Sequence, residues 1–560
     1  MIKRTYYSLL LVVLLAAACR QGGKKPVSEA VNRDTTHYAK QEYIAQTLDS
    51  SQVGAFLAQH AEFAPYGELI REFYDKRGYH YAWIDEHGVT EQAGGFLNMM
   101  RSDEESGITQ GGLLDKSRAQ ALYDSLATQG DSLNRNDTIV PITELTLTGQ
   151  FFVYANQVWG GMTSDSAKDL EWFIPRKKID VESVLNAVIA NPKKGITEEE
   201  PVNRQYKLLR DELQKMAVIV KEHPAWDSLR MEDKKKTYQK GDSSTVIAGV
   251  KKRLQLLGDM QDKDSSTQYT PVLDSALRSY QARMGHKPDG VIRPQTLAAL
   301  NRPLQHYMHQ LLLNMERLRW VPVEVSTDYI LVNIPEFRMH AYEDGQLAWS
   351  CNVVVGTPGA STVIFSRDMK YVVFSPYWNV PPGILGNEVI PGIRRSGASY
   401  LARHNMEVVG ASGKAISPGS INWSKYSGRN FPYIVRQKPG GSNSLGRVKF
   451  LFPNEYNIYL HDTPSKGLFN ETRRSFSHGC IRVAEPKHLA QWVLRKDSTW
   501  TEAKIDAAMN AGKEKYVTLK NKLPVFIGYF TAWVNSEGKL NFRDDVYGHD
   551  AKLAKLLFGK

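Results

Sequence analysis

The chain has 560 residues, of which 42% are hydrophobic and 23% are charged, values typical of a globular protein long enough for three or more domains. Lysine and arginine exceed aspartate and glutamate by 71 − 60 = 11. This basic balance fits an acidic polymer, an anionic membrane surface or merely a solvated surface. No basic run with interleaved aromatic residues indicates a nucleic-acid site, so we expect no nucleic-acid partner.

The first 19 residues are typical of an export signal. Lys3 and Arg4 precede an apolar segment, Leu9 to Ala18, which is too short to span a bilayer as a mature helix. The segment ends at Cys19 after three alanines and resembles a bacterial lipoprotein signal, in which Cys19 is lipidated and becomes the new N-terminus. Cleavage without lipidation remains an alternative. Residues 20–54 are polar and predict a tether, and no later stretch is apolar enough for a transmembrane helix.

Residues 55–240 predict a helical domain. Apolar side chains recur at helical spacing in three places, which are Leu69 to Tyr74, Val181 to Val188 and Leu208 to Leu213. This region has no catalytic motif, so its apolar stripes indicate core packing.

Residues 246–303 predict a compact unit of three short helices. It resembles the small peptidoglycan-binding module in the residues Leu254, Ala276, Tyr280-Gln281, Asp289-Gly290-Val291 and Thr296 to Asn301. Arg293 stands where that module usually has glycine. The unit is therefore interpreted either as a binding module or as a structural spacer.

From residue 304 the pattern predicts a connecting helix (304–328) and then a mainly-β domain (329–510). Tyr329 onward alternates with a period of two, Asp344-Gly345 is a hairpin signal, and Pro486 to Leu494 predicts a helix. Further strands are expected at Val353 to Val355, Tyr371 to Phe374, Tyr433 to Arg436, Lys449 to Phe452 and Ile458 to Leu460. Residues 386–428 interrupt the strands and predict a helical lid insertion over a cleft. Residues 511–560 are expected to complete the domain, with Val525 to Val534 and Leu540 to Phe542 as a closing hairpin.

One stretch carries the chemistry. It contains His461-Asp462 and, 477 − 461 = 16 positions after His461, Ser477-His478-Gly479-Cys480. An imidazole can take the proton of a thiol, which makes a cysteine nucleophile. Glycine before Cys480 lets a substrate approach the backbone, and the N–H groups around it can face an oxyanion.

Two alternatives to a cysteine nucleophile follow from the same residues. His461, His478 and Cys480 are conceivable zinc ligands, but no fourth cysteine or histidine is suitably placed, so we expect no metal. Cys351 and Cys480 are the only cysteines besides Cys19, so a structural disulfide between them is arithmetically possible. A plain structural cysteine does not need this density of histidine and glycine.

The motif resembles the signature of the L,D-transpeptidase catalytic domain, in the large form that carries a scaffold domain in the Gram-negative envelope. Further matching segments are Pro376 to Pro382, Arg436 to Gly440, Asn443 to Gly446, Lys449-Phe450, Tyr459 to Pro464, Phe73-Tyr74, Tyr79, Ala82-Trp83 and Leu147 to Gly149. The resemblance extends from about Ala55 to Tyr547. It implies a multidomain α+β fold with a helical scaffold domain, a small three-helix peptidoglycan-binding-like module and a mainly-β catalytic domain.

The resemblance also implies roles for individual residues. Cys480 is the expected nucleophile and His461 the base, with the backbone carbonyl of Asp462 orienting the imidazole; His478 as the base is an alternative. The N–H groups of His478, Gly479 and Cys480 are expected to form the oxyanion hole. The candidate substrate-binding residues are Arg482, Ser477, Tyr377, Trp378 and Asn379. Arg482 suits a substrate carboxylate, with a structural ion pair as its alternative.

The implied reaction transfers an acyl group without a cofactor. Cys480 attacks the carbonyl between the third stem residue of peptidoglycan and its terminal D-alanine, and a second stem's amine resolves the thioester. Carbapenems are expected to acylate Cys480. Hydrolysis or exchange by the same thioester is an alternative, and so is a non-catalytic wall-binding lipoprotein. A papain-like peptidase is disfavoured because there the cysteine precedes the histidine. The expected location is the periplasm, with a lipid anchor, and the expected partners are peptidoglycan stem peptides.

Overall fold

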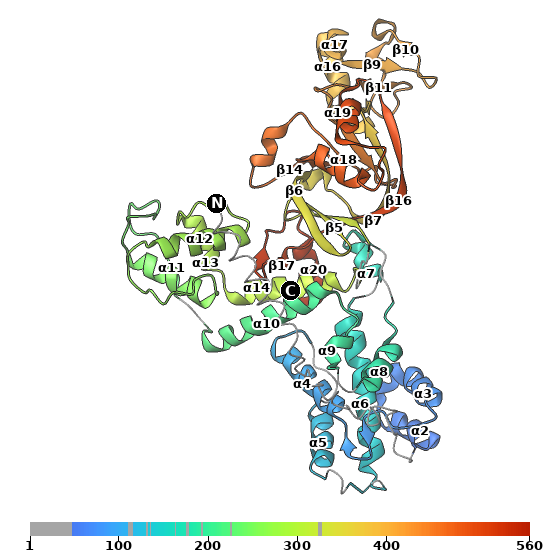
Figure 1. The fold of residues 1–560 in the computed structure, drawn as a ribbon, viewed down its shortest axis with the longest axis vertical. Coiled ribbons are helices and arrows are strands. Elements are labelled where there is room, and N and C mark those ends of the chain that lie inside the picture. The colour runs from blue at the N-terminus through green and yellow to red at the C-terminus, as the bar shows by residue number, and fades with distance from the viewer. Residues whose placement is uncertain are drawn as a thin grey trace, which may run out of the picture.

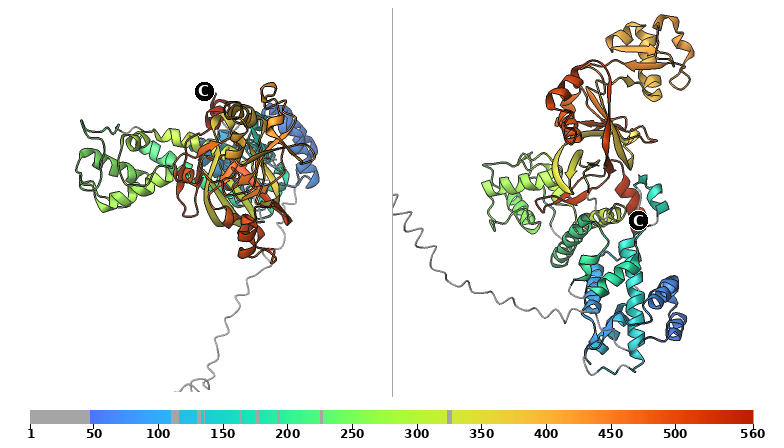
Figure 2. Two further views of the ribbon diagram at one scale, coloured as in Figure 1. Left: turned by 90° about the horizontal axis from the view of Figure 1, so that it is seen from above. Right: turned by 45° about the vertical axis from the view of Figure 1, so that its right-hand side comes forward.

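The structure, a computed structural model, describes residues 47–109, 116–129, 133–134, 136–162, 164–174, 178–191, 194–224, 227–322 and 327–559. It is an elongated molecule in which helices form one end, a β-rich domain forms the other, and a three-helix unit projects from the side (Figures 1 and 2). This arrangement confirms the predicted multidomain α+β fold. Cys19 lies outside the described residues. Within the described part, no helix combines the length and the hydrophobicity needed to cross a membrane.

The helical end packs around a long buried helix, α6. Its main elements are α2 (Ser50–Gln59), α3 (Gly67–Lys76), α4 (Glu91–Glu105), α5 (Lys116–Ala127), α6 (Ile139–Tyr154), α8 (Val181–Ala190) and α10 (Arg204–Glu222). Each expected apolar stripe falls on one of these helices, which are α3, α8 and α10 respectively. Leu69 is the exception within its stripe, because its side chain is exposed.

A buried carboxylate explains why two distant stretches of the helical region carry characteristic residues. Glu144 on α6 accepts hydrogen bonds from the N–H groups of Ala82 (2.5 Å) and Trp83 (3.0 Å) and from the hydroxyl of Tyr74 (2.8 Å). Thr148, one turn further on, accepts from the indole N–H of Trp83 at 3.0 Å. Burial raises the pKa of Glu144 to about 7. These hydrogen bonds satisfy a polar group that would otherwise be costly to bury.

The three-helix unit consists of α11 (Thr245–Leu256), α12 (Pro271–Arg283) and α13 (Pro294–Leu300). Arg293, which replaces the usual glycine, forms a bidentate ion pair with Asp289, in which both N–O distances are 2.9 Å. Its backbone N–H also donates to the Thr296 hydroxyl at the start of α13. Arg293 is therefore part of the turn that shapes this unit.

The expected connecting helix is a central element of the molecule. Helix α14 (Leu304–Leu318) buries the polar side chains of Asn314, Glu316 and Arg317. Glu316 accepts from the backbone N–H of Met162 (2.6 Å), whereas Arg317 pairs with Asp550 (2.5 Å) on α20 (His549–Phe558). The helix thus bonds to both the scaffold region and the C-terminal segment.

The β-rich domain is built on a sheet that closes on itself. The strands are β3 (Trp172–Phe173), β4 (Tyr329–Asn333), β5 (Arg338–Glu343), β6 (Gln346–Gly356), β7 (Ile364–Phe374), β12 (Val448–Leu451), β13 (Leu460–His461), β14 (Ser475–Ser477), β15 (Ile481–Val483) and β16 (Lys515–Gly528). They run in the order β12-β13-β15-β6-β5-β4-β16-β7-β3, and β12 also pairs with β7, which closes a ring. Helices α18 (Pro486–Leu494) and α19 (Glu502–Asn510) pack beside it.

Two strand predictions were wrong in extent. The strand expected at Ile458 to Leu460 is instead Leu460–His461. The strand expected at Val525 to Val534 ends at Gly528, because β16 pairs there with β4 and β7. The closing hairpin is formed by β17 (Ala532–Val534) and β18 (Leu540–Phe542), with the turn near Gly538 as expected.

The expected lid is larger than residues 386–428 and is only partly helical. Residues 378–437, here called the inserted subdomain, contain β8 (Trp378–Asn379), α15 (Pro382–Ile384), α16 (Ile390–Ser396), α17 (Ser399–Arg403), β9 (Met406–Val409), β10 (Ala415–Ile416) and β11 (Ile434–Gln437). They form a separate sheet and a separate hydrophobic core. Figure 2 shows this subdomain at the far end of the β-rich domain. Its polar sequence concealed strands that pair only with each other.

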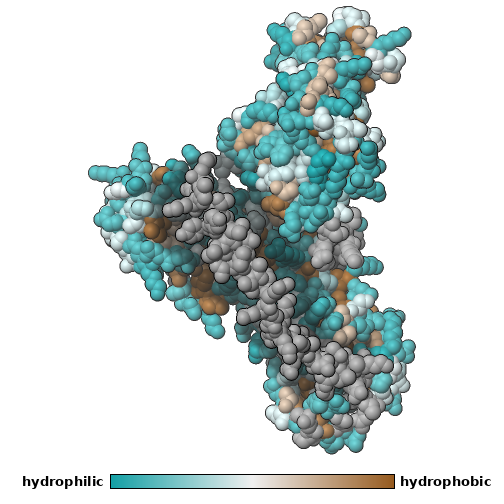
Figure 3. Space-filling view, in the orientation of Figure 1, coloured by the Kyte–Doolittle hydropathy of each residue, from teal (hydrophilic) through white to brown (hydrophobic). Residues whose placement is uncertain are grey.

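Exposed large hydrophobic side chains are dispersed over many elements. The face in Figure 3 is mostly hydrophilic, with hydrophobic residues scattered among hydrophilic ones. The described residues therefore present no broad apolar surface on that face, which is the normal condition for a protein surface in water.

A stability prediction follows from a buried ion pair in the helical region. Arg210 on α10 contacts both carboxylate oxygens of Glu200, at 2.5 and 2.8 Å, and both side chains are at least 94% buried. Arg210→Met leaves a buried carboxylate unpaired, which we expect to cost about 3–5 kcal/mol of local stability. Hydrogen exchange of peptides from α10 measures this loss.

Lys215→Met on the same helix is the matched control. Lys215 pairs with Glu212 at 2.6 Å, but its side chain is 68% exposed, so about 1 kcal/mol or less is expected. Equal losses in the two variants would contradict the importance of burial.

Candidate functional site

The site is positioned by two short parallel strands, β13 and β15. Leu460 pairs with Ile481, and His461 pairs with Arg482. The Ile481 N–H donates to the carbonyl of Tyr459 at 3.1 Å, which extends the register to Tyr459 and Cys480. Since side chains alternate along strands, Tyr459, His461, Cys480 and Arg482 share one face. The structure therefore brings together the histidine and cysteine that the sequence separates by 19 positions.

His461 is held as a neutral base. Its side chain is buried, and Nδ1 donates to the carbonyl oxygen of Asp462 at 2.5 Å. A carbonyl accepts only from a protonated Nδ1, so this bond leaves Nε2 with the lone pair. Burial lowers the pKa of His461 to about 4. The imidazole is consequently neutral at pH 7, with its one N–H on Nδ1.

Cys480 is half-buried, in surroundings that disfavour its charge. Burial raises the pKa of its thiol, whereas hydrogen bonding from Tyr459 and the charge of Arg482 act in the opposite direction. In the resting structure the thiol donates to the carbonyl of Asn457 at 3.5 Å. Cys480 is therefore a thiol that needs a base, which is the role that His461 can fill.

The side chain of Asp462 organises the backbone around the base. Its carboxylate accepts from the N–H groups of Arg447 (2.8 Å) and Thr463 (2.7 Å) and pairs with Lys466 at 2.6 Å. A Cβ on Gly446, which has φ +60°, would lie 2.3 Å from this carboxyl group. The sequence identified the carbonyl of Asp462 but not this second function of its side chain.

The loop before Cys480 uses some of the groups that were expected to meet substrate. Ser477 is buried, and its hydroxyl donates to the carbonyl of Cys480 (2.5 Å) and accepts from the N–H of Gly479 (3.2 Å). Gly479 has φ +110°, and its carbonyl accepts from Thr362 at 2.7 Å. In this structure, the Ser477 hydroxyl and the Gly479 N–H therefore hydrogen-bond within the loop. The expectations that Ser477 binds substrate and that the Gly479 N–H lines an oxyanion hole stay predictions.

The other two oxyanion-hole candidates are the backbone N–H groups of His478 and Cys480. Neither donates a hydrogen bond within the described chain. The side chain of His478 is 62% exposed and lies 3.6 Å from Glu388 of the inserted subdomain. Its ring therefore faces the subdomain and solvent, an arrangement that favours His461 as the base.

Arg482 and the segment Tyr377 to Asn379 have different surroundings. Arg482 is half-buried beside His461, and its Nε has no hydrogen-bond partner within the described residues. Tyr377 lies under the guanidinium of Arg436, 4.1 Å from the ring centre. Trp378 and Asn379 form β8 at the base of the inserted subdomain. In the described structure, no hydrogen bond or ring contact joins these three residues to Cys480 or His461.

The geometry around Cys480 bears on two alternatives, a disulfide with Cys351 and a zinc site. Cys351 and Cys480 are both free, and Cys351 is buried on β6, where its thiol pKa rises to about 12. The disulfide is therefore absent. Among the described residues, no group of three histidine, cysteine, aspartate or glutamate side chains is arranged to hold a metal ion.

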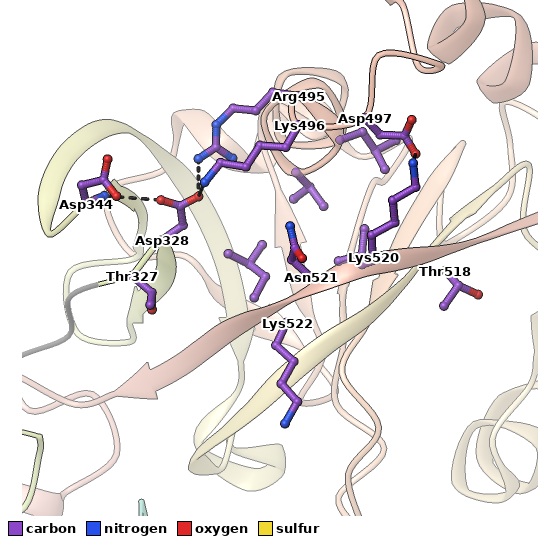
Figure 4. Close-up of a pocket in the computed structure, with 14 residues that line it drawn as sticks. Thr327, Asp328, Asp344, Arg495, Lys496, Asp497, Thr518, Lys520, Asn521 and Lys522 are labelled. Carbon is purple, nitrogen blue, oxygen red and sulfur yellow. Dashed lines mark hydrogen bonds and ion pairs between the residues drawn. The ribbon is translucent and has the colours of Figure 1, made fainter.

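A surface hollow elsewhere on the β-rich domain is not part of this site. It lies between the end of α18, the start of β4 and an irregular part of β16 (Figure 4). Asp328 pairs there with Arg495 (2.6 Å) and Lys496 (2.7 Å), and Asp497 pairs with Lys520 (3.2 Å). None of the candidate catalytic residues lines it.

Three family models match successive parts of the chain. Residues 68–213 match the "Scaffold domain", residues 245–300 the "Putative peptidoglycan binding domain" and residues 327–506 the "L,D-transpeptidase catalytic domain". A curated relative, "Putative L,D-transpeptidase" from Haemophilus influenzae, is 35% identical over 247 residues, or 44% of this chain. The match spans 48% of that relative, about half its length.

Solved structures of L,D-transpeptidases are also similar to this chain. One from Stackebrandtia nassauensis has 11% identity and a TM-score of 0.21, covering 55% of this chain and 98% of that one. One from Mycobacterium smegmatis has 11% identity and a TM-score of 0.18, covering 36% and 58%. TM-scores this low carry no argument about this chain. By the family-model matches, residues 327–506 are similar to the L,D-transpeptidase catalytic domain, and two preceding regions are similar to a scaffold domain and to a putative peptidoglycan-binding domain.

Proposed function

We propose that this protein is a peptidoglycan L,D-transpeptidase that crosslinks the third residues of two stem peptides through a thioester on Cys480. The observation that carries the proposal is the placement of His461 and Cys480 on one face of paired strands, with the imidazole tautomer fixed by Asp462. Such a pair is the arrangement that nucleophilic catalysis by a thiol requires.

The proposed reaction has two steps. The Cys480 thiol passes its proton to Nε2 of His461 and attacks the carbonyl that joins the third stem residue to D-alanine. His461 returns the proton to the departing D-alanine, and a thioester remains. The amine of a second stem then attacks the thioester, and Cys480 is restored as a thiol. In this proposal, the N–H groups of His478 and Cys480 stabilise the oxyanion in both steps.

The positive charges of Arg482 and of the whole chain favour a substrate rich in carboxylates. Arg482 lies beside His461 with an unpartnered Nε, and a guanidinium binds carboxylates well because its geometry is bidentate. The net charge of +11 points in the same direction. Hydrolysis or exchange through the same thioester is the second candidate, since water and free D-amino acids can also resolve a thioester.

The decisive experiment uses purified disaccharide-tetrapeptide and mass spectrometry. We expect the soluble protein to form a dimer that lacks one D-alanine, and Cys480→Ala to form none, because the nucleophile is gone. His461→Ala should lower the rate by roughly two to four orders of magnitude, the usual contribution of a general base.

His478→Ala is the control for the assignment of the base, and its effect should be smaller than that of His461→Ala. Tripeptide without dimer would indicate hydrolysis. Dimer formation by Cys480→Ala would exclude the proposed nucleophile.

The pH dependence should reflect the low pKa of His461. The base acts when it is neutral, so activity is lost only as pH falls through about 4, rather than through the usual value near 6.5. We therefore expect single-turnover release of D-alanine to vary little between about pH 5 and pH 7. A loss of activity centred near pH 6.5 would show that the histidine is protonated far more readily than its burial implies.

The proposed location is the periplasm, with a lipid on Cys19. The support is the sequence pattern of a short apolar segment followed by small residues and cysteine. Expression of the full chain in a Gram-negative host should yield mature protein whose mass includes the lipid, whereas Cys19→Ser should not carry it. A mature wild-type N-terminus without lipid would favour ordinary cleavage.

A further inference from the structure

Tyr459 is a further residue of the site and lies beside Cys480. Its carbonyl accepts from the N–H of Ile481 at 3.1 Å, which places Tyr459 beside Cys480 across the β13–β15 pair. It shares a strand face with His461, two positions further on, and the ring centres of the two side chains are 5.7 Å apart. The phenol therefore lies next to both partners of the proton transfer.

The surroundings of the phenol direct its hydroxyl toward the sulfur. Burial raises the pKa of Tyr459, and the charge of the neighbouring Cys480 and a hydrogen bond between the two side chains raise it further. The described residues offer no other hydrogen-bond partner for this hydroxyl. A phenol with a raised pKa keeps its proton at every pH at which the thiol titrates, so it remains a donor throughout.

The charged groups around Cys480 do not replace this donor. His461 uses Nδ1 for the Asp462 carbonyl and needs Nε2 as an acceptor. The carboxylate of Asp462 pairs with Lys466, and His478 lies against Glu388. Lys449 on β12 is 3.7 Å from Glu514, and Arg482 acts on the sulfur through its charge.

The carbonyl of Asn457 makes a compensating donor necessary. It accepts the thiol proton at 3.5 Å, an interaction that exists only for the neutral thiol. Asn457 has φ +54° and is held by Asn454, whose side chain accepts from the N–H of Ile458 at 3.2 Å. The Asn457 carbonyl is thus fixed in position. When the proton leaves Cys480, this carbonyl no longer stabilises the sulfur, so a hydrogen-bond donor is needed to favour the thiolate.

We propose that Tyr459 is a catalytic residue whose hydroxyl donates a hydrogen bond to the sulfur of Cys480 and stabilises the thiolate as its proton passes to His461. No bond to carbon changes in this step. The proton moves from sulfur to Nε2, and the phenol keeps its own proton. The inference builds on the proposed role of Cys480 as the nucleophile, but the stabilised thiolate is testable without any peptidoglycan.

The test is the rate of Cys480 alkylation by iodoacetamide as a function of pH, followed by mass spectrometry of the full chain. Tyr459→Phe removes only the hydroxyl. Loss of a hydrogen bond to a charged group should slow alkylation below the thiol pKa by about tenfold or more, and it should move the midpoint upward by about one unit. Tyr456→Phe, a nearby half-buried tyrosine that packs on Phe365, should behave like the wild type.

Cys351 reports on folding in the same experiment. It is 2% exposed, so it stays unlabelled while the fold is intact. An upward shift for Cys480 with Cys351 still protected supports the inference. A Tyr459→Phe profile that superimposes on the wild-type profile overturns it, whether or not the protein crosslinks peptidoglycan. If Cys351 becomes labelled, the measurement is repeated at a lower temperature at which it is protected, and the same two outcomes apply.

Discussion

The parallel pairing of β13 with β15 is the constraint on which the site depends. A shift of one residue in this register would turn Cys480 to the opposite face from His461. Strand β13 has only two residues, so its own interstrand hydrogen bonds are too few to fix its position. The Asp462 carboxylate supplies the missing support through Arg447, Thr463 and Lys466. The same residue therefore fixes both the strand and, through its carbonyl, the imidazole.

The domains are joined by buried polar contacts and by a shared strand. Asn314 on α14 bonds to the hydroxyl and N–H of Thr531, while Glu316 on the same helix reaches the scaffold region. Strand β3 extends the sheet of the β-rich domain by pairing with β7, although it follows the helices of the scaffold region in the chain. Buried polar groups require exact partners, so these contacts specify one geometry between the regions. A linker made only of apolar contacts would define the geometry less strictly.

Sequence patterns predicted what depends on local periodicity or on a specific motif. The helices and the His461 and Cys480 pair belong to this class, as does the Asp344-Gly345 turn. The inserted subdomain was underestimated because its short strands pair only with one another, a long-range property that polar composition conceals. The internal use of Ser477 and of the Gly479 N–H was missed for a related reason. Whether a polar group faces the substrate or its own loop depends on φ angles that the sequence does not state.

In the resting site, burial disfavours the charged forms of both His461 and Cys480. Burial lowers the pKa of His461 and raises that of Cys480, so the neutral pair is the stable form. Oxidation proceeds through the thiolate, so a neutral Cys480 is also protected from oxidation. Cys351 adds no risk of a disulfide, since it is buried and separate. The site thus keeps the Cys480 sulfur neutral at rest and holds beside it an imidazole that can accept its proton.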